Sequence, residues 1–179
     1  MRCAVFDIDN TLFDSRRRLY LVLRKYGVTS PSEVPLSMRK RFWIDYMDPS
    51  LFHLDRPIYR TIEMVLEAKL RGLKVVLITG RYEMVRVPTE IQLRSAGVPF
   101  DELLMRPDDN MDKDYILKPN LVRKIECKLS EYHDDDLETL LTLRKMFPDA
   151  IYFHHQPDGT FTIIGGADDK EGSKGVQHG

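Results

Sequence analysis

Short apolar runs alternate with helical segments along most of the chain, and this alternation restricts the fold more than any other feature. A short apolar run bounded by turn residues is typical of a buried strand. The expected strands cover residues 2–7, 73–78, 102–105, 128–133, 150–154 and, at an edge, 161–164. The helices expected between them cover residues 57–71, 84–95, 119–127 and 137–147. This order predicts an α/β fold with a mostly parallel sheet and right-handed crossovers.

Two of these helices carry more specific predictions. In the helix that Pro57 opens, apolar residues recur at helical spacing and should form its buried face: Ile58, Ile62, Val65, Leu66 and Leu70. In the helix expected at 119–127, Pro119 suits the first turn and should hold Lys118 in an extended conformation.

The 179 residues suit one domain, which we expect to cover residues 1–164. Helices expected at 16–26 and 37–46 would form a small helical lid insertion over residues 16–55, and the Gly-rich polar tail 165–179 should be disordered. Cys3 and Cys127 are too few for a disulfide framework, which fits a reducing compartment. There is no apolar run near the roughly 20 residues that span a bilayer, and the early acidic residues do not suit a signal peptide. We therefore expect a cytoplasmic protein without membrane contacts.

The near-neutral charge balance, 27 Lys and Arg against 28 Asp and Glu, hides two opposed segments. Residues 16–41 contain eight basic residues and one acidic residue, whereas residues 101–136 contain eleven acidic and six basic residues. Such asymmetry is more informative than the net charge. The basic segment can hold phosphate, and Phe42, Trp43 and Tyr46 behind it can either stack bases or pack the lid onto the core.

Polar residues follow three of the expected strands. Asp7, Thr79 and the run 134–136 each come just after a strand ends. In open α/β sheets this edge is where ligands bind, so we expect these groups to converge on one rim.

Asp7 and Asp9 lie two residues apart, which in an extended backbone places them on the same side. Two such carboxylates can act as an ionised nucleophile and a proton donor if their surroundings separate their pKa values. Asn10 suits a left-handed position in the turn that follows. The alternative is an ordinary turn rich in Asp and Asn.

The other rim residues have two interpretations each. The Thr79 hydroxyl and the close backbone approach allowed by Gly80 suit a phosphate, but the same pair also suits a simple strand-to-helix turn. Lys118 supplies a point charge for a phosphoryl group or is a surface lysine. The run 134–136 offers hard oxygen ligands for Mg²⁺, or forms the acidic first turn of the next helix.

The order of these groups resembles the four motifs of the haloacid dehalogenase (HAD) superfamily of phosphohydrolases. DIDNTLFDS is a specific match, and the resemblance covers most of residues 2–154. It implies a Rossmann-like three-layer α/β/α core and Mg²⁺-dependent hydrolysis of a phosphomonoester through an aspartyl-phosphate. Within the superfamily, LKVVLITGR, RPDDNMDKDYILKP and YHDDDLETLLTLRK resemble the 3′-phosphatase domain of bacteriophage polynucleotide kinase.

This resemblance implies a role for each matched residue. Asp7 would be the nucleophile, Asp9 the general acid and base, and Lys118 the partner of the phosphoryl group. The substrate would be bound by Asn10, Thr79, Gly80 and Arg81, and the metal by Asp7, Asp9, Asp134 and Asp135. The chain departs from that domain at Asp136, where an Arg is usual, and at Thr79, where a Ser is usual.

The substrate favoured by the resemblance is a polynucleotide 3′-phosphate. A nucleotide or another small phosphomonoester is the alternative, because the same catalytic set serves both. A non-catalytic module that binds phosphate or nucleic acid on this scaffold is a further alternative. The chain contains no GxxxxGK[ST] motif, so no kinase domain is expected, and no obligate protein partner can be inferred. For His154 and His155, a polar strand end is favoured over a second metal site.

Overall fold

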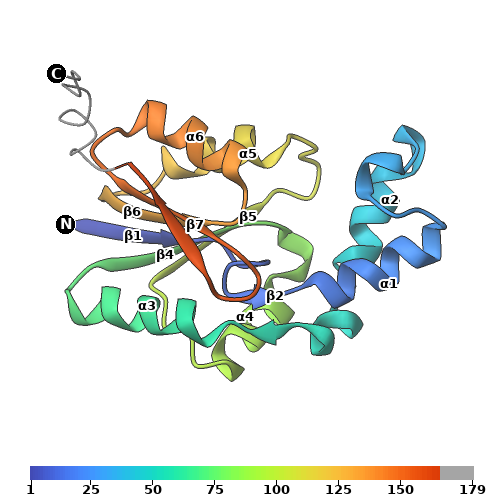
Figure 1. Cartoon of the computed structure of the whole chain (residues 1–179), viewed down its shortest axis with the longest axis horizontal. Coiled ribbons are helices and arrows are strands. Elements are labelled where there is room, and N and C mark those ends of the chain that lie inside the picture. The colour runs from blue at the N-terminus through green and yellow to red at the C-terminus, as the bar shows by residue number, and fades with distance from the viewer. Residues whose placement is uncertain (166–179) are drawn as a thin grey trace, which may run out of the picture.

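One six-stranded sheet organises the protein, whose computed structural model describes residues 1–165. The strand order is β5-β4-β1-β6-β7-β8, with β1 near the middle (Figure 1). The strands are β1 (Arg2–Phe6), β4 (Lys74–Tyr82), β5 (Glu102–Arg106), β6 (Lys128–Asp134), β7 (Ile151–His155) and β8 (Phe161–Ile164). The first five are parallel, and only the edge strand β8 runs antiparallel to its neighbour β7. All six predicted strands are therefore present.

Helices cover both faces of the sheet, which confirms the three-layer α/β/α architecture (Figure 1). One face carries α3 (Tyr59–Leu70) and α4 (Arg86–Ser95), the latter preceded by the short 3-10 helix η3 (Glu83–Val85). The other face carries α5 (Asp114–Val122) and α6 (Leu137–Met146). Within residues 1–165, no helix has the length and apolar character needed to cross a bilayer.

Strand β1 is buried on both faces because its side chains alternate between the two layers. Ala4 and Phe6 belong to the core cluster under α3 and α4, whereas Cys3 and Val5 belong to the cluster under α5 and α6. All four side chains are fully buried. Burying an aliphatic or aromatic side chain of this kind contributes about 1.5–3 kcal/mol. The strand is thus fixed from both sides, and it delivers the next residue, Asp7, to the rim in a defined position.

The buried face of α3 differs from the prediction at two residues. Leu66 and Leu70 are 44% and 87% exposed. Thr61 and Ala68 are buried in their place. Thr61, Val65 and Ala68 follow the i, i+4, i+7 spacing of one helix face, whereas Leu66 is turned about 100° from Val65 and Leu70 lies at the end of the helix.

Helix α5 begins at Asp114, so the prediction for Pro119 and Lys118 was wrong. Pro119 lies inside the helix, where its missing N–H leaves the carbonyl of Tyr115 without its usual helical partner. Lys118 is helical rather than extended. Most residues at the end of α5 are buried, and their packing outweighs the local preference of proline.

Between β2 (Phe13–Asp14) and β3 (Arg56–Pro57), the chain projects beyond the end of the sheet (Figure 1). This α1–α2 segment, residues 16–55, contains α1 (Arg16–Tyr26) and α2 (Leu36–Tyr46), with the 3-10 helices η1 (Pro31–Glu33) and η2 (Pro49–Leu54). That it acts as a lid, and that residues 1–164 form a single domain, stay predictions. The predicted disorder of 165–179 falls, apart from Gly165, outside the described residues.

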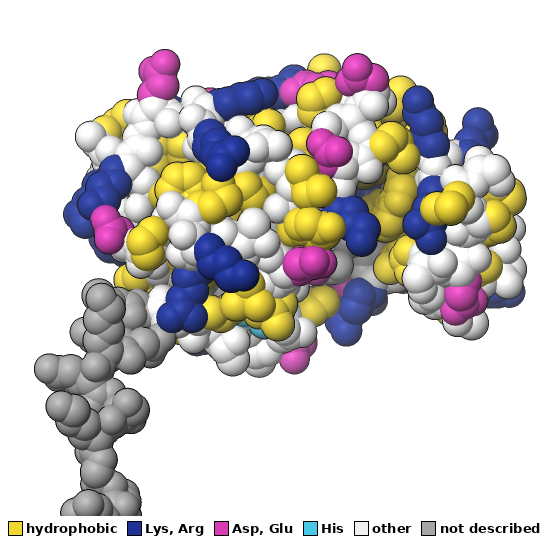
Figure 2. Space-filling view, turned by 90° about the horizontal axis from the view of Figure 1, so that it is seen from above, with side chains coloured by type: hydrophobic (Ala, Val, Ile, Leu, Met, Phe, Trp, Pro, Cys, Tyr) yellow, Lys and Arg dark blue, Asp and Glu magenta, His cyan; other side chains and the backbone are white. Residues whose placement is uncertain are grey.

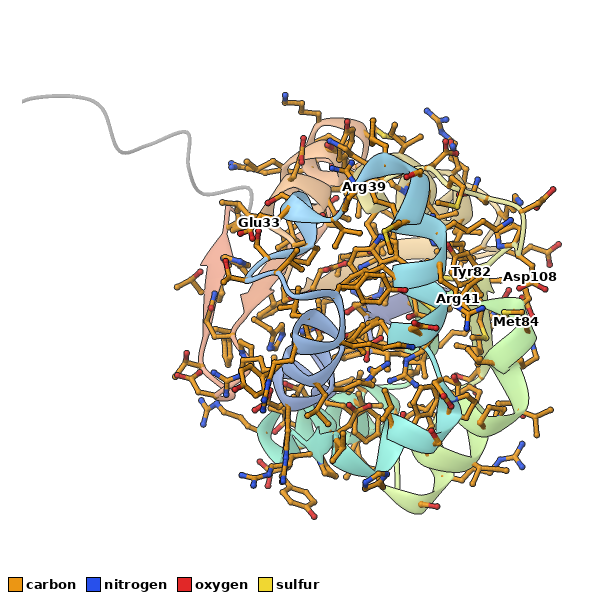
Figure 3. The ribbon with its side chains drawn as sticks, turned by 90° about the vertical axis from the view of Figure 1, so that its right-hand side faces the viewer. Glu33, Arg39, Arg41, Tyr82, Met84 and Asp108 are labelled. Carbon is orange, nitrogen blue, oxygen red and sulfur yellow. A yellow bond between two sulfur atoms is a disulfide. The ribbon has the colours of Figure 1, made fainter. Side chains whose placement is uncertain are left out.

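The aromatic residues of α2 pack the segment together, as one of the two interpretations predicted. Phe42 and Tyr46 are buried in a cluster with Val22 and Leu23 of α1. Tyr82 of β4 joins the same cluster, and Figure 3 shows it beside α2. Because their rings are covered, Phe42 and Tyr46 are not available to stack bases.

Part of the basic charge of residues 16–41 is neutralised locally. Lys25 and Arg41 both pair with Asp45, at 2.6 and 3.0 Å, and Arg18 is fully buried. Arg39 donates to the carbonyl of Val34. Seen from above, acidic and basic side chains are interspersed with hydrophobic ones (Figure 2). The segment therefore does not present its full sequence charge to a ligand.

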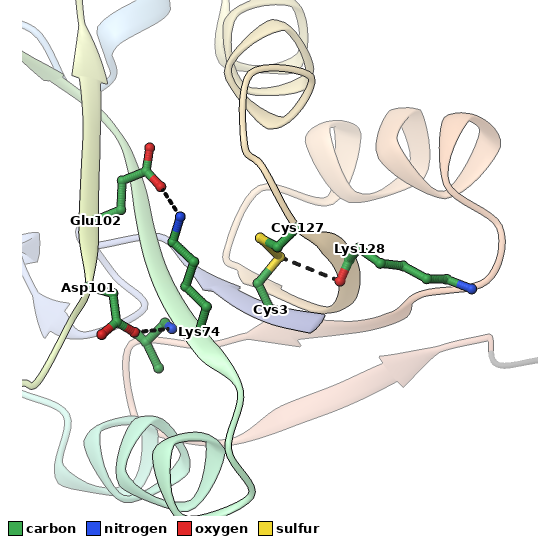
Figure 4. Close-up of a disulfide and its surroundings, with 7 residues drawn as sticks. Cys3, Lys74, Asp101, Glu102, Cys127 and Lys128 are labelled. Atoms are coloured by element: carbon green, nitrogen blue, oxygen red, sulfur yellow. Dashed lines mark hydrogen bonds and ion pairs between the residues drawn. A yellow bond between two sulfur atoms is a disulfide. The ribbon is translucent and has the colours of Figure 1, made fainter. Parts of the chain in front are cut away.

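The two cysteines form a single disulfide, whereas their small number in the sequence predicts a reducing compartment (Figure 4). Cys3 at the start of β1 and Cys127 just before β6 are 124 residues apart in sequence, with Cα atoms 5.9 Å apart. The pairing of β1 with β6 brings them together, and no spacing rule in the sequence reveals it. The bond lies at the amino-terminal ends of these strands, opposite the rim that carries Asp7.

A histidine pair is buried inside the sheet layer. His133 of β6 stacks between the rings of Phe6 and Phe153, with ring centroids 4.0 and 4.2 Å apart. Its Nδ1 atom lies 2.9 Å from Nε2 of His155, which contacts the Thr61 hydroxyl through Nδ1. Burial lowers the pKa of His155 to about 3 and also lowers the pKa of His133. His155 therefore has a packing role, and His154 contacts the carbonyl of Asp135.

This pair predicts a loss of stability in acid. Below pH about 6.5 the unfolded chain binds protons that the folded chain excludes, so the free energy of unfolding falls as the pH falls towards 3. With a pKa of about 3, neutral His155 accounts for about 2 kcal/mol by pH 5, and His133 acts in the same direction. We expect His155→Gln to lose less stability than wild type between pH 7 and pH 5 in urea unfolding. Parallel pH profiles for the two proteins would contradict this, and His53→Gln, at an exposed position, is the control.

Candidate active site

The loop after β1 holds the first pair of predicted site residues. The Asp7 N–H donates to the carbonyl of His133 at 2.9 Å, which ties the end of β1 to β6. The N–H groups of Leu12 and Phe13 then both donate to the carbonyl of Ile8 and close a tight turn. Asn10 sits in this turn at φ 60°, the left-handed conformation predicted for it.

Lys118 is the centre of a buried ionic cluster. Its Nζ atom lies 2.9 Å from Asp7 Oδ1, 2.7 Å from Asp134 Oδ2 and 3.4 Å from Asp114 Oδ2. Its side chain is only 1% exposed, so the surface-lysine interpretation was wrong. Burial opposes the charged form, but Asp134 and Asp7 raise the pKa of Lys118 well above its ordinary value. The lysine is therefore a fixed positive charge beside Asp7.

Asp7, Asp134 and Asp135 form a carboxylate cluster that can hold a metal ion. One oxygen from each lies within 4.8 Å of the others. Burial raises the pKa of Asp7 well above its ordinary value, against the opposing charge of Lys118, and raises that of Asp135 to about 7. A single lysine does not balance these carboxylates, and three hard oxygen donors suit a small divalent cation. The donor set therefore fits Mg²⁺.

Asp136, the third acidic residue of the run, has a structural role. Its carboxylate accepts from the N–H groups of Glu138 and Thr139, at 3.3 and 3.2 Å, and caps α6. Asp134 is anchored in turn by the N–H of Asp136, at 2.9 Å. The run thus divides: the helix-turn interpretation holds for Asp136, and the first two aspartates face the cluster.

The carboxylate of Asp9 lies between two buried arginines. Arg81 donates to it from Nε and Nη2, at 2.9 and 2.8 Å, and Arg18 donates from Nη2. Although burial acts in the opposite direction, the two guanidinium groups hold the pKa of Asp9 well below its ordinary value. The structure thus separates the two carboxylates, with the pKa of Asp7 raised and that of Asp9 lowered. Asp9 is outside the three-aspartate cluster, and its role as a metal ligand stays a prediction.

Asp55 completes this second ionic group. It accepts from Arg18 Nε at 2.9 Å and from Gln92 Nε2 at 2.9 Å, with Arg81 Nη2 at 3.4 Å. Asp55 ends the α1–α2 segment, so the segment and the sheet edge share one network. Arg18 and Arg81 also lie over aromatic rings, those of Tyr46 and Phe52 respectively.

Thr79 and Gly80 lie at the bend of β4 next to this network. The Thr79 hydroxyl accepts from the N–H of Arg81 at 3.1 Å. A Cβ on Gly80 would lie 2.9 Å from Asp114 Oδ1, so a larger residue would displace the carboxylate that contacts Lys118. Arg106 fixes the same region by donating to the carbonyl of Gly80 at 3.0 Å and to Asp114 at 2.5 Å. Gly80 is therefore needed for a close approach of the Asp114 side chain.

Sequence reasoning missed four residues of the site. Arg18 and Asp55 were assigned to the lid, and nothing in their local sequence distinguishes them from solvent-exposed charges. Asp114 carried a usable signal, because it stands four residues before Lys118, where a helix brings the two together. Arg106 follows an apolar strand directly, as the predicted rim residues do, and its position was an overlooked signal.

The family is established by a comparison of the sequence with known protein families. The model of the HAD superfamily, subfamily IIIB (acid phosphatase) matches residues 1–128, which is more than half of the chain. The chain belongs to this family. It is a HAD-type phosphatase, as the motifs predicted. A search of curated proteins finds no match.

Solved structures share the fold at low sequence identity. A chain of the Pnkp1/Rnl/Hen1 complex has a TM-score of 0.56 at 22% identity, and the match covers 80% of this protein and 42% of that chain. This protein thus spans less than half the length of that neighbour. A haloacid dehalogenase-like hydrolase from Streptococcus pneumoniae has a TM-score of 0.57 at 14% identity, covering 80% of each chain. A class C acid phosphatase from Bacillus anthracis has a TM-score of 0.50 at 17% identity, covering 77% of this protein and 53% of that chain.

Proposed function

We propose that this protein hydrolyses phosphomonoesters through an aspartyl-phosphate on Asp7, with Mg²⁺ as cofactor and a polynucleotide 3′-phosphate as preferred substrate. The observation that carries the proposal is the buried cluster in which Lys118 contacts both Asp7 and Asp134. It joins a nucleophile, a fixed cation for a phosphoryl group and a divalent-metal donor set at one edge of the sheet. The cytoplasm is the compartment we propose for this activity, although a disulfide such as Cys3–Cys127 is rare there.

The first step is attack by Asp7 on phosphorus. Lys118 bonds to Asp7 Oδ1 and so orients the carboxylate, leaving Oδ2 to form the new O–P bond. The bond from phosphorus to the leaving oxygen breaks, and that oxygen receives a proton from Asp9. Water then attacks the phosphorus, giving its proton to Asp9 and releasing phosphate and the Asp7 carboxylate. Bound Mg²⁺, held by Asp7, Asp134 and Asp135, would neutralise charge on the phosphoryl oxygens.

Asp9 needs a mechanism for acquiring its proton, because its two arginines favour the ionised form. A phosphoryl dianion bound beside Arg81 competes for the guanidinium group, which weakens the stabilisation of the Asp9 carboxylate. Its pKa then rises as the substrate binds. Asp9 is thus ionised in the free protein and becomes a proton donor only in the complex. Once it has given this proton to the leaving oxygen, it is again a carboxylate and can act as the general base for water.

Two observations support different substrates. The structural likeness to a chain of the Pnkp1/Rnl/Hen1 RNA repair complex supports a phosphorylated nucleic-acid end. The small α1–α2 segment, with two short helices, also suits a bulky end. The match to the acid phosphatase family instead supports small phosphomonoesters as the second candidate.

The deciding experiment has two stages. Release of phosphate from an aryl phosphate, with Mg²⁺ and with EDTA, tests the chemistry. Absence of turnover together with tight phosphate binding would favour a non-catalytic binding module. A panel of 3′-phosphorylated DNA and RNA oligonucleotides, mononucleotides and sugar phosphates then tests the substrate. Oligonucleotides hydrolysed no faster than small phosphates, without salt dependence, would remove the nucleic-acid proposal.

Two variants, one that removes the hydroxyl and one that keeps it, test the role of Thr79. Removing one hydrogen-bonding group from a site of this kind costs on the order of 3 kcal/mol, or about 100-fold in kcat/KM. We therefore expect Thr79→Ala to lose about 100-fold on an aryl phosphate and Thr79→Ser to retain most activity. Equal activity of the two variants would show that the hydroxyl contributes nothing to the reaction.

A further inference from the structure

A groove of about 320 Å³ lies beside the proposed active site and is not used by the mechanism. One wall comes from β2, β3 and the first residues of α1 and α3, and the other from the β7–β8 turn. Figure 1 shows this turn beside β2. Arg56, which lines the groove, directly follows Asp55, the carboxylate that shares Arg18 with Asp9. The β7–β8 turn follows β7, in which His154 lies opposite Asp134 of the neighbouring strand β6. The groove therefore opens at the same edge of the sheet.

The groove contains three arginines and two aspartates. Arg16 is paired with Asp14 by two hydrogen bonds, at 2.9 and 2.8 Å. Asp158 accepts from the N–H and hydroxyl of Thr160. Within residues 1–165, neither Arg56 nor Arg60 forms an ion pair with a carboxylate, and both are exposed. Two guanidinium groups are thus available to an anionic ligand, and their planar donors suit phosphodiester oxygens.

Exposed aromatic rings accompany these arginines. Tyr59 lines the groove and is 69% exposed. Tyr20, on the exposed side of α1 one turn beyond Arg16 and Arg17, is 58% exposed and lies under the guanidinium of Arg24. Exposed tyrosines beside arginines are the combination with which proteins bind single-stranded nucleic acid, since the arginines contact phosphates and the rings stack on bases.

We propose that this groove binds the nucleotides next to the phosphorylated end of a single-stranded oligonucleotide, with Arg56 and Arg60 on phosphodiesters and Tyr59 against a base. This inference rests on the proposed polynucleotide substrate, and it adds the place on the protein where the nucleotides next to the phosphorylated end bind. A small phosphomonoester has no phosphodiester or second base and gains nothing from the groove. The groove thus determines specificity, whereas the Asp7 cluster serves both substrate classes.

The test compares two substrates on the same variants. KM is measured for a 3′-phosphorylated hexanucleotide and for an aryl phosphate, with Arg56→Ala/Arg60→Ala, Tyr59→Ala, and the exposed far-edge control Arg123→Ala/Lys124→Ala. We expect the double arginine variant to raise the oligonucleotide KM about tenfold more than the aryl phosphate KM. Its salt dependence for the oligonucleotide should be shallower by about 0.7 per lost phosphate contact. Arg56→Lys/Arg60→Lys should restore part of the affinity.

Equal KM changes for both substrates, or none for either, would overturn the groove proposal. If the wild type does not hydrolyse the oligonucleotide, the proposed substrate fails separately. The groove is then tested by fluorescence anisotropy with a dye-labelled, unphosphorylated hexanucleotide. Weaker binding by the double arginine variant than by the far-edge control would support the groove, and equal binding would refute it.

Discussion

Asp7→Asn should abolish phosphatase activity, by about 10⁴-fold or more, without loss of the fold. The amide has the shape of the carboxylate but cannot form the acyl-phosphate bond that divides the hydrolysis into two steps. The fold should persist because Asp7 is buried beside two other carboxylates, those of Asp134 and Asp135, where its own negative charge is unfavourable. A carboxyl whose folded pKa is raised destabilises the folded state once the pH exceeds its unfolded value. Replacing it with a neutral amide at pH 7 therefore removes an unfavourable charge.

Two measurements together check this result: phosphate release from an aryl phosphate with Mg²⁺, and the melting temperature in EDTA. We expect the melting temperature to stay within a few degrees of wild type or to rise. Asp149→Asn is the matched control, because Asp149 is 76% exposed and pairs with Lys128 at the opposite edge of the sheet. Activity above about 1% of wild type in Asp7→Asn would contradict the covalent mechanism.

The sheet could be predicted from the sequence because its signals are local. Each parallel strand is a short apolar run, and the covering helices repeat their apolar residues at helical spacing. Errors arose where tertiary packing overrides a local preference. Pro119 inside α5 and the exposed Leu70 at the end of α3 are both of this kind. The residues next to Pro119 and Leu70 in the sequence give no sign that the usual preference fails at these two positions.

The site was predictable in part for a related reason. Asp7, Thr79 and Asp134 are strand-end residues, and parallel strands bring their carboxyl ends to one edge. Arg18 and Asp55 reach Asp9 from a segment whose path depends on how α1 and α2 pack. The disulfide depends in the same way on the pairing of β1 with β6. Contacts set by long-range packing leave no periodic pattern in the sequence.

The structure also changes how the charge of the basic segment 16–41 is interpreted. The basic segment 16–41 looked like a phosphate-binding surface, but several of its cations bind carboxylates of the protein itself. Arg18 is buried against Asp9 and Asp55, and Lys25 and Arg41 share Asp45. Arg17 and Arg24 stay exposed within the segment, and the two arginines that line the groove, Arg56 and Arg60, lie just beyond it. Counting charges along the sequence therefore indicates that the protein can bind an anionic ligand, but not which surface binds it.

Lys118→Met should reduce both activity and stability, and Mg²⁺ should restore part of the stability. The lysine is the only cation in contact with Asp7 and Asp134 among the described residues, and all three side chains are at most 4% exposed. Removing one partner of a buried ion pair costs about 3–5 kcal/mol, because the remaining charges are left uncompensated. Loss of the fixed charge beside the nucleophile should lower kcat by about 10³-fold.

The response to Mg²⁺ distinguishes this cluster from a purely structural ion pair. A cation that binds only the folded state stabilises it by about 2.7 kcal/mol at 100 times its Kd. Without Lys118, the three aspartates carry more uncompensated negative charge and should bind Mg²⁺ more tightly. The melting temperature of Lys118→Met should therefore rise more on addition of Mg²⁺ than that of wild type or of the exposed control Lys124→Met. If Mg²⁺ shifts all three proteins equally, the lysine and the metal do not share these carboxylates, and the proposed cofactor site is wrong.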